Sequence, residues 1–263
     1  MTPETTDTET PETETSETEA AGSKTAVTET RETPDPRDTR DTLETSALVP
    51  IVIFDLDNTL VHSRIDFLGI RTLIINRLLA VGALAEPPAN PRVRAIPEWL
   101  DVAAAFDPLL AADLWRAVDR FERAGMIEGT VEDDARATLD HLHAAGLKLA
   151  VLTNNSLESA EAALDRFGLR TPFDLVLARD VVPALKPSGV GVAKAHGSLG
   201  GGPTYMVGDS YIDGLAAQRA AVGARFVAFR ANLADLEVRG VTTWAATQAL
   251  SEVPPLLLAA TLT

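Results

Sequence analysis

Residues 49–59 read VPIVIFDLDNT, an apolar run that ends in two aspartates, Asp55 and Asp57, separated by one leucine. The apolar part is typical of a buried β-strand. Aspartate is a poor strand former and an isolated charge is costly to bury, so two carboxylates here indicate a cation or a reaction. In an open parallel α/β sheet, ligands bind at the carboxyl ends of the strands. The segment therefore predicts a strand, a ligand-binding edge and a metal site.

After residue 130 the chain alternates between predicted helices and predicted strands. The helices are predicted at 131–145, 157–167, 188–197 and 211–221, and the strands at 147–153, 173–177, 204–207 and 225–229. Strands that alternate with helices of about ten to fifteen residues form parallel βαβ units with right-handed crossovers. We therefore expect an α/β protein with a Rossmann-like parallel sheet core, built from residues 48–62 and 130–263.

The segment between these two parts of the core, residues 63–129, contains only helical spacing. Helices are predicted at 64–80, 97–106 and 107–124, the last with Asp107 as its N-cap. We expect this segment to be a helical domain inserted into the core. Trp99 and Trp115 fall among apolar residues at helical spacing, and we interpret both as part of its interior.

Residues 1–47 are dominated by Thr, Glu, Asp, Ser and Pro and contain no aromatic residue. Such a segment buries too little apolar surface to offset its backbone entropy, so we expect a disordered acidic tail. It carries a large share of the net charge of −15, which leaves the remainder mildly acidic. A nucleic-acid or anionic membrane surface would need clustered Lys and Arg instead. Without a signal peptide or an apolar run of roughly 20 residues, we expect a cytoplasmic protein.

Further polar residues follow later predicted strands. Thr153 and Asn154 follow one strand, Lys186 precedes a helix that begins with proline, and Asp209 and Asp213 follow another strand. Because the carboxyl ends of parallel strands share one edge of the sheet, we expect all of them to converge with the two aspartates of the first strand.

The expected gathering of four carboxylates requires a cation. Oxygen ligands without a nearby histidine favour a hard ion, and Mg²⁺ is the expected one. Lys186 and Thr153 add a positive charge and a hydroxyl donor, which suit a phosphate beside the metal. A carboxylate that attacks phosphorus forms an aspartyl-phosphate, and a second carboxylate can protonate the leaving oxygen and later activate water.

These segments together resemble the four motifs of the haloacid dehalogenase superfamily, whose members are aspartate-nucleophile phosphohydrolases. The motifs are Phe54-Asp55-Leu56-Asp57-Asn58-Thr59-Leu60, Leu152-Thr153-Asn154, Lys186-Pro187 and Gly208-Asp209-Ser210-Tyr211-Ile212-Asp213. The resemblance covers about residues 50–230. It implies Asp55 as the nucleophile and Asp57 as the general acid and base. Asp55, the backbone carbonyl of Asp57 and Asp209 would hold Mg²⁺, and Asp213 would orient the cluster.

The resemblance also implies that Thr153, Asn154 and Lys186 bind the phosphoryl group. The helical insertion looks like the cap that shapes the leaving-group pocket in phosphoglycolate-phosphatase-like members. One departure is Asn58, where glycine is the commoner residue. Asparagine tolerates left-handed backbone geometry, so we expect this departure to cost little.

The expected function is therefore that of a Mg²⁺-dependent phosphatase acting on a small phosphorylated metabolite, with phosphoglycolate or a similar monoester as substrate. A nucleotidase or a phosphosugar mutase on the same core is the enzymatic alternative. The non-enzymatic alternative is a catalytically idle interaction protein that recruits partners through its acidic tail, which the intact motifs disfavour. Oligomeric state has no signal in the sequence.

Overall fold

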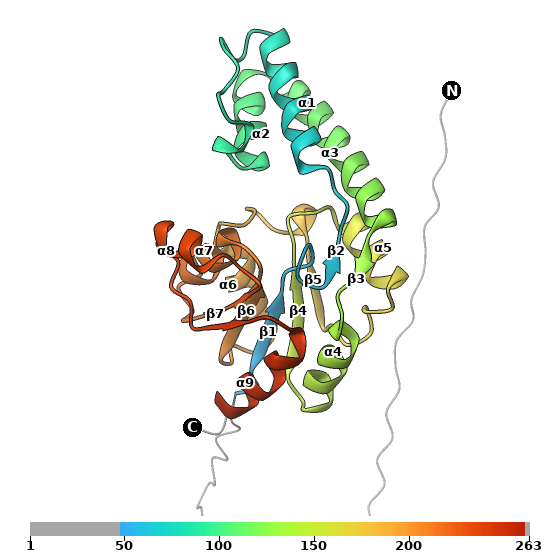
Figure 1. Cartoon of the computed structure of the whole chain (residues 1–263), viewed down its shortest axis with the longest axis vertical. Helices are drawn as coiled ribbons and strands as arrows, with labels where there is room; N and C mark the ends of the chain where they lie inside the picture. The colour runs from blue at the N-terminus through green and yellow to red at the C-terminus, as the bar shows by residue number, and fades with distance from the viewer. Residues whose placement is uncertain (1–47, 261–263) are drawn as a thin grey trace, which may run out of the picture. The chain divides into compact units, whose positions relative to one another are not determined.

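The computed structural model describes residues 48–260 (Figure 1). The acidic tail predicted at residues 1–47 lies outside the described residues, so its predicted disorder stays a prediction. No helix in the described range is long and apolar enough to span a membrane.

A six-stranded parallel sheet forms the centre of the described part, in the order β5-β4-β1-β6-β7-β8 (Figure 1). Its strands are β1 (Ile51–Phe54), β4 (Lys148–Leu152), β5 (Leu175–Leu177), β6 (Thr204–Gly208), β7 (Arg225–Phe229) and β8 (Ala245–Thr247). All four residues of β1 are fully buried, as expected for a central strand covered on both faces. The chain leaves β1 toward β4 on one side and returns to β6 on the other, so the edge beside β1 is a topological switch point. The prediction of a parallel α/β core is confirmed.

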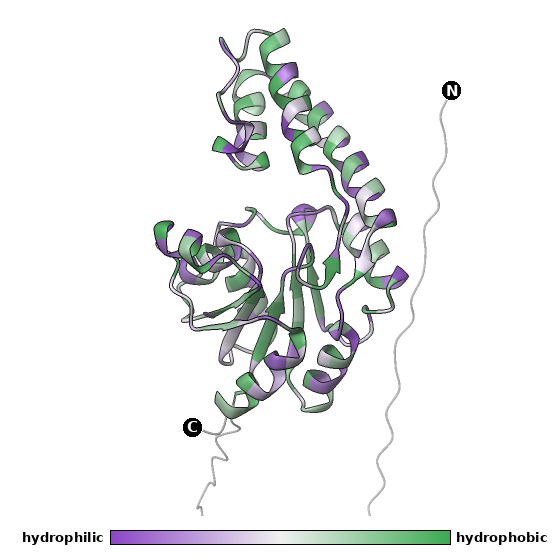
Figure 2. Cartoon of the chain, in the orientation of Figure 1, coloured by the Kyte–Doolittle hydropathy of each residue, from purple (hydrophilic) through white to green (hydrophobic). Residues whose placement is uncertain are grey.

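Helices cover both faces of this sheet. They are α4 (Ala135–Ala144), α5 (Leu157–Arg166), α6 (Val190–Ser198), α7 (Tyr211–Arg219), α8 (Leu233–Val238) and α9 (Val253–Ala260), with the short η2 (Arg179–Val181) and η3 (Leu250–Glu252) between them. One apolar cluster joins one face of the sheet to α4, α5 and α9, and a second joins the other face to α6 and α7. Figure 2 shows the strands as hydrophobic and the surrounding helices as mixed in character.

Three helices lie between residues 62 and 130 of the chain (Figure 1). They are α1 (Phe67–Ala80), α2 (Ile96–Phe106) and α3 (Pro108–Glu128), with the short η1 (Pro91–Val93) between α1 and α2. The chain enters this segment through β2 (Val61–His62) and leaves it through β3 (Thr130–Val131), which pair antiparallel. We call the helical segment between β2 and β3 the cap.

Two predicted helix boundaries were wrong at the end of the cap. The helix predicted from Val131 begins at Ala135, because Thr130 and Val131 pair with β2 instead. The helix predicted to stop before Gly125 continues to Glu128. Gly125 is needed there for close packing rather than as a stop, since a Cβ would lie 2.4 Å from the backbone nitrogen of Ile65.

Candidate active site

The turn after β1 places two aspartates at the carboxyl edge of the sheet. The backbone nitrogen of Asp55 donates to the carbonyl of Val207 at 2.9 Å, so the nitrogen stays within the sheet. Asn58 then adopts a left-handed conformation with φ of 59°, and its nitrogen donates to Val61 at 2.7 Å. This is the geometry for which asparagine was expected to substitute well for glycine. The turn leaves Asp57 two residues beyond Asp55, and both aspartates line the same cleft.

Lys186 lies buried between two carboxylates. Its Nζ donates to Oδ1 of Asp55 at 2.5 Å and to Oδ1 of Asp213 at 2.7 Å. Burial opposes the positive charge, but Asp213 and Asp55 outweigh it and hold the pKa of Lys186 above its usual value. Lys186 is therefore a fixed cation beside Asp55.

Asp213 is fully buried and uses both carboxylate oxygens. Oδ1 accepts from Lys186, and Oδ2 accepts from the backbone nitrogen of Ser210 at 3.2 Å and from its hydroxyl at 2.7 Å. Gly208 makes room for this carboxylate, because a Cβ on Gly208 would lie 2.5 Å from Cγ of Asp213. Asp213 is thus held by the start of α7 and in turn holds Lys186.

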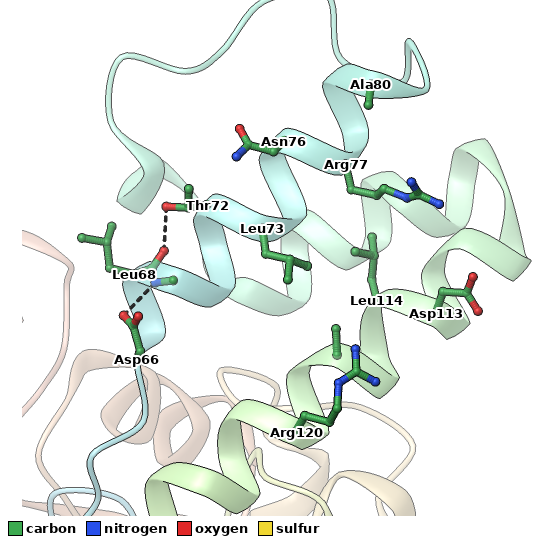
Figure 3. Close-up of a pocket in the computed structure, with 12 residues that line it drawn as sticks. Asp66, Leu68, Thr72, Leu73, Asn76, Arg77, Ala80, Asp113, Leu114 and Arg120 are labelled. Atoms are coloured by element: carbon green, nitrogen blue, oxygen red, sulfur yellow. Dashed lines mark hydrogen bonds between the residues drawn. The ribbon is translucent and has the colours of Figure 1, made fainter.

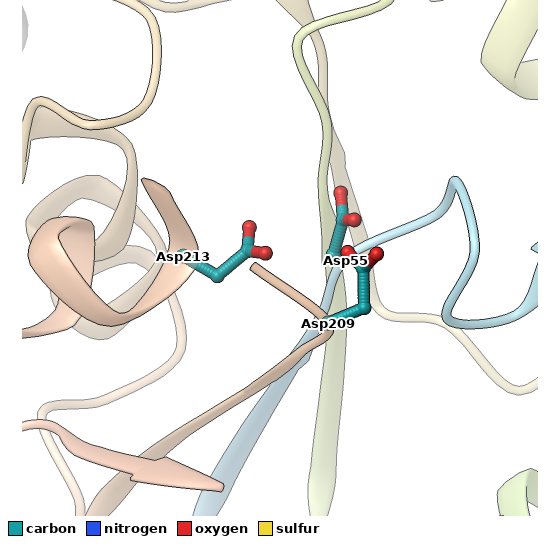
Figure 4. Close-up of side chains that lie close together, drawn as sticks. All are labelled: Asp55, Asp209 and Asp213. Atoms are coloured by element: carbon teal, nitrogen blue, oxygen red, sulfur yellow. The ribbon is translucent and has the colours of Figure 1, made fainter. Parts of the chain in front are cut away.

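A group of three carboxylates could hold a divalent cation. Asp55, Asp209 and Asp213 bring ligand oxygens within 4.8 Å of one another (Figure 4). Burial, followed by the charge of Asp213, raises the pKa of Asp209 to about 7. Burial and the neighbouring carboxylates also raise the pKa of Asp55, against the opposing effect of Lys186. One lysine for three carboxylates leaves excess negative charge on hard oxygen donors, which fits a hard divalent cation. Since both oxygens of Asp213 are engaged, Asp55 and Asp209 are the side chains of this group that suit direct ligation.

Asp57 differs from the other aspartates in its surroundings. Its Oδ2 accepts from Nδ2 of Asn155 at 2.5 Å, while Oδ1 is buried without a hydrogen-bond partner. Burial raises the pKa of Asp57 to about 6, although the nearby side chains of Ser63 and Asn155 act in the opposite direction. A carboxyl group with this pKa exchanges a proton near neutral pH, as a general acid and base must. The sequence analysis did not assign a role to Asn155, whose only signal was its place beside Asn154.

Asn154 makes two bonds to the backbone of Lys186. Its Nδ2 donates to the Lys186 carbonyl and its Oδ1 accepts from the Lys186 nitrogen, both at 2.9 Å. Thr153 is buried next to it, and its Oγ1 accepts from the nitrogen of Asn155 at 3.2 Å. The structure therefore brings the residues of all four motifs to one edge of the sheet, and the side chain of Asn154 positions the lysine.

A family model described as haloacid dehalogenase-like hydrolase matches residues 49–221. The chain belongs to this family. Its membership, together with the parallel sheet, confirms the resemblance seen in the sequence and the expectation of a hydrolase.

Named relatives and solved structures agree with this assignment. The chain is 34% identical over 196 residues to a phosphoglycolate phosphatase of Caulobacter vibrioides, covering 68% of this chain and 78% of that protein. It is 30% identical over 190 residues to the pyrophosphatase PpaX of Halalkalibacterium halodurans, covering 68% and 83%. The crystal structure of a predicted phosphoglycolate phosphatase from Haemophilus somnus shares the fold, with a TM-score of 0.56 at 19% identity, covering 81% and 99%.

In this haloacid dehalogenase-like hydrolase, Arg179 connects the sheet edge to the cap. Its guanidinium donates to the carboxylate of Glu122 on α3 at 2.8 and 3.2 Å, to Asp119, and to the carbonyl of Asn154 at 3.0 Å. It also lies 4.4 Å from the ring centre of Trp115. Glu122 is buried, and burial raises its pKa against the opposing effect of Arg179. No local sequence pattern predicts this network, because Arg179 is 60 residues from Asp119 and 57 residues from Glu122 along the chain.

A cleft of about 490 Å³ lies above the motif residues, between the sheet edge and the cap. Its core wall contains Asp55, Asp57, Thr153, Lys186 and Asp209, and its cap wall contains Phe67, Arg71, Arg92, Arg94 and Trp115. Trp99 is buried in the cap, as predicted. Trp115 packs against the same apolar cluster, but it is only partly buried and also lines the cleft. The prediction that it belongs to the cap interior therefore describes one side of the ring only.

Proposed function

We propose that this hydrolase is a Mg²⁺-dependent phosphatase that hydrolyses a small phosphate monoester through an aspartyl-phosphate intermediate. The observation that carries the proposal is the buried ion triad of Asp55, Lys186 and Asp213 beside Asp57, a carboxyl group with a pKa of about 6. Such an arrangement supplies a fixed nucleophile, a fixed cation and an exchangeable proton within one cleft.

The first half of the reaction would use Asp55 and Asp57. An oxygen of Asp55 attacks phosphorus, the bond from phosphorus to the ester oxygen breaks, and that oxygen takes a proton from Asp57. Lys186 lies against Asp55 and offsets negative charge on the phosphoryl oxygens. Thr153 and the backbone around Asn154 lie at the same strand end and would donate to the phosphoryl group.

The second half would return the enzyme to its starting state. Asp57, now ionised, takes a proton from a water molecule that attacks the phosphorus of the aspartyl-phosphate. The bond from phosphorus to the Asp55 oxygen breaks, which releases inorganic phosphate and restores the Asp55 carboxylate. Asp55 and Asp209, with the backbone carbonyl of Asp57, would hold Mg²⁺, which when bound supplies positive charge to the phosphoryl oxygens. Asp213 would keep Lys186 in place throughout.

The proposed substrate is phosphoglycolate or a similar small monoester. The names of several relatives support this choice, since they include phosphoglycolate phosphatases of Caulobacter vibrioides and Cereibacter sphaeroides. The pyrophosphatase relative adds pyrophosphate to the set to be tested. Trp115, an aromatic side chain that lines the cleft, keeps nucleotides in the same set.

The proposal is tested by measuring phosphate release from a panel that contains phosphoglycolate, 2-hydroxyethyl phosphate, pyrophosphate, nucleoside monophosphates and hexose phosphates, with Mg²⁺ and with EDTA. We expect Mg²⁺-dependent release that Asp55→Asn abolishes and that Asp140→Asn, an exposed change on α4, leaves intact. Turnover by Asp55→Asn would contradict the mechanism. Isomerisation of a hexose phosphate without net phosphate release would identify a mutase instead.

A further inference from the structure

The cap wall of the cleft carries three arginines, and together they have no acidic partner. Arg71 comes from α1, while Arg92 and Arg94 come from η1 and the residue that follows it. None of the three forms an ion pair with a carboxylate in residues 48–260. Arg239, which lines the cleft from the core, differs because it is paired with Asp235 at 2.9 Å.

Arg71 is the most constrained of the three. It is half-buried, Nη1 donates to the carbonyl of Phe67 at 3.0 Å, and Nε is buried without a partner. Burial and the nearby charge of Arg92 both lower the pKa of Arg71, whereas Tyr211 on the core side acts in the opposite direction. A buried guanidinium donor left without a partner, beside a second guanidinium, is costly in the free protein.

Under the proposed function, the core wall of the cleft would bind one anion, the phosphoryl group of the substrate. Lys186, with a metal that Asp55 and Asp209 would hold, would receive this group, and these residues lie on the core rather than on the cap. The cap arginines face the same cleft of about 490 Å³ from the leaving-group side. Guanidinium groups suit oxyanions because their donors form two parallel hydrogen bonds.

We propose that Arg71, Arg92 and Arg94 form a second anion subsite, which binds an oxyanion on the leaving group of the substrate. This assignment rests on the proposed phosphatase function and adds to it a specificity-determining set of residues. A carboxylate is the oxyanion of phosphoglycolate and a second phosphate is that of pyrophosphate, and the three arginines offer the same chemistry to both.

A second groove supplies matched controls on the same cap. It has a volume of about 860 Å³ and lies along α1 and α3, and it contains Arg77, Arg120, Asp66 and Asp113 (Figure 3). Arg77 is on the same helix as Arg71 but does not line the catalytic cleft. Arg77→Gln therefore removes the same charge from the same helix without touching the proposed subsite.

The first experiment measures binding, which needs no turnover. Phosphonoacetate, methylenediphosphonate and ethylphosphonate are titrated into the Mg²⁺-loaded full chain by calorimetry. We expect the two probes with a second anion to bind wild type at least about tenfold more tightly than ethylphosphonate, as charge-assisted hydrogen bonds imply. Arg71→Gln and Arg92→Gln should remove this preference, and Arg77→Gln should keep it.

The second experiment compares kcat/KM for phosphoglycolate and 2-hydroxyethyl phosphate, which share a two-carbon leaving group but differ in charge. Arg71→Gln should lower kcat/KM for phosphoglycolate at least about tenfold, mainly through KM, and change that for 2-hydroxyethyl phosphate by less than about threefold. Arg71→Lys should recover part of the loss.

The outcomes separate the subsite from the phosphatase proposal. Equal binding of all three probes by wild type, or equal losses for both esters in Arg71→Gln, would overturn the subsite. Preferential binding of phosphonoacetate without hydrolysis of any ester would instead refute the phosphatase function and leave the subsite standing. A preference for methylenediphosphonate over phosphonoacetate would assign the subsite to a second phosphate.

Discussion

Asn154 is bonded to Lys186 through both ends of its side-chain amide, which contact the carbonyl and the nitrogen of the lysine at 2.9 Å each. The lysine lies on a loop 32 residues further along the chain, and this pair of bonds fixes its backbone. The position of Nζ against Asp55 therefore depends on the side-chain amide of Asn154, which follows β4, the strand next to β1.

Asn154→Ala should weaken catalysis more than it weakens the fold. Loss of both bonds should lower the free energy of unfolding by about 1–3 kcal/mol, and the displaced lysine should lower kcat/KM by roughly a hundredfold. Urea unfolding and steady-state kinetics measure the two effects. Asn76→Ala, an exposed change on α1, should alter neither. Unchanged kinetics in Asn154→Ala would show that Lys186 holds its place without the amide.

Asp57→Asn should lower kcat in a way that depends on the leaving group. The amide cannot donate or accept the transferred proton, so turnover of an alkyl phosphate should fall by about 10²–10⁴-fold. An aryl phosphate needs less protonation of its leaving oxygen, so its first step should fall much less. Single-turnover measurements with both esters test the difference, and equal losses would contradict a role for Asp57 as general acid.

Removal of the metal should make stability depend on pH. The pKa of Asp209 rises from its ordinary value of 3.8 to about 7 in the folded protein. A raised pKa stabilises the fold at low pH only, and this stabilisation is lost as the pH rises through the folded-state value. The free energy of unfolding in EDTA should therefore fall between about pH 4 and pH 7, and Mg²⁺ should reduce that fall.

Asp209→Asn is the control for this pH dependence. It removes the titrating group, so the fall in EDTA should be smaller than in wild type, and Mg²⁺ should restore less stability. Identical pH profiles for Asp209→Asn and wild type in EDTA would assign the pH dependence to other groups.

The buried ion pair between Arg179 and Glu122 should contribute strongly to the stability of the contact between cap and core. Arg179→Met leaves Glu122 buried without its partner and should cost about 3–5 kcal/mol in the free energy of unfolding. The double change with Glu122→Gln should recover part of this loss, because it removes the unpaired charge. Arg123 and Glu158 form a matched exposed pair between α3 and α5, and Arg123→Met should cost at most about 1 kcal/mol. Similar losses in the free energy of unfolding for Arg179→Met and Arg123→Met would contradict a special contribution of the buried pair.

Gly208→Ala should disturb the site through Asp213. The new Cβ would lie 2.5 Å from Cγ of Asp213, so the carboxylate that holds Lys186 must move. We expect kcat to fall by roughly a hundredfold in phosphate-release assays. Gly197→Ala is the matched control, since nothing lies within 4 Å of its new Cβ and it falls within α6. That change should leave kcat intact and stabilise the fold by about 0.5–1 kcal/mol.

The parts that were predictable from sequence are those with a local pattern. The apolar run before Asp55 indicated a buried strand, and the alternation of strands and helices after residue 130 indicated the parallel sheet. That arrangement predicted that Lys186 and Asp209 lie at the same edge as Asp55. By contrast, the two-residue strands β2 and β3 are too short to show any periodicity. The pairing of Arg179 with Glu122 and the gathering of the cap arginines depend on how distant segments pack, which spacing along the chain does not encode.

The two chain crossings between core and cap bear on how such an enzyme can be remodelled. Val61 pairs with Val131, and the nitrogen of Arg64 donates to the carbonyl of Gly125 at 3.0 Å, so the insertion leaves and rejoins the core at neighbouring points. The strand that carries Asp55 is complete before the first crossing. The cap could therefore be replaced by a different insertion between β2 and β3. Such a replacement would change the substrate preference and leave the residues at the sheet edge in place. The new insertion would need to supply an acidic side chain that pairs with Arg179, as Glu122 does in this protein.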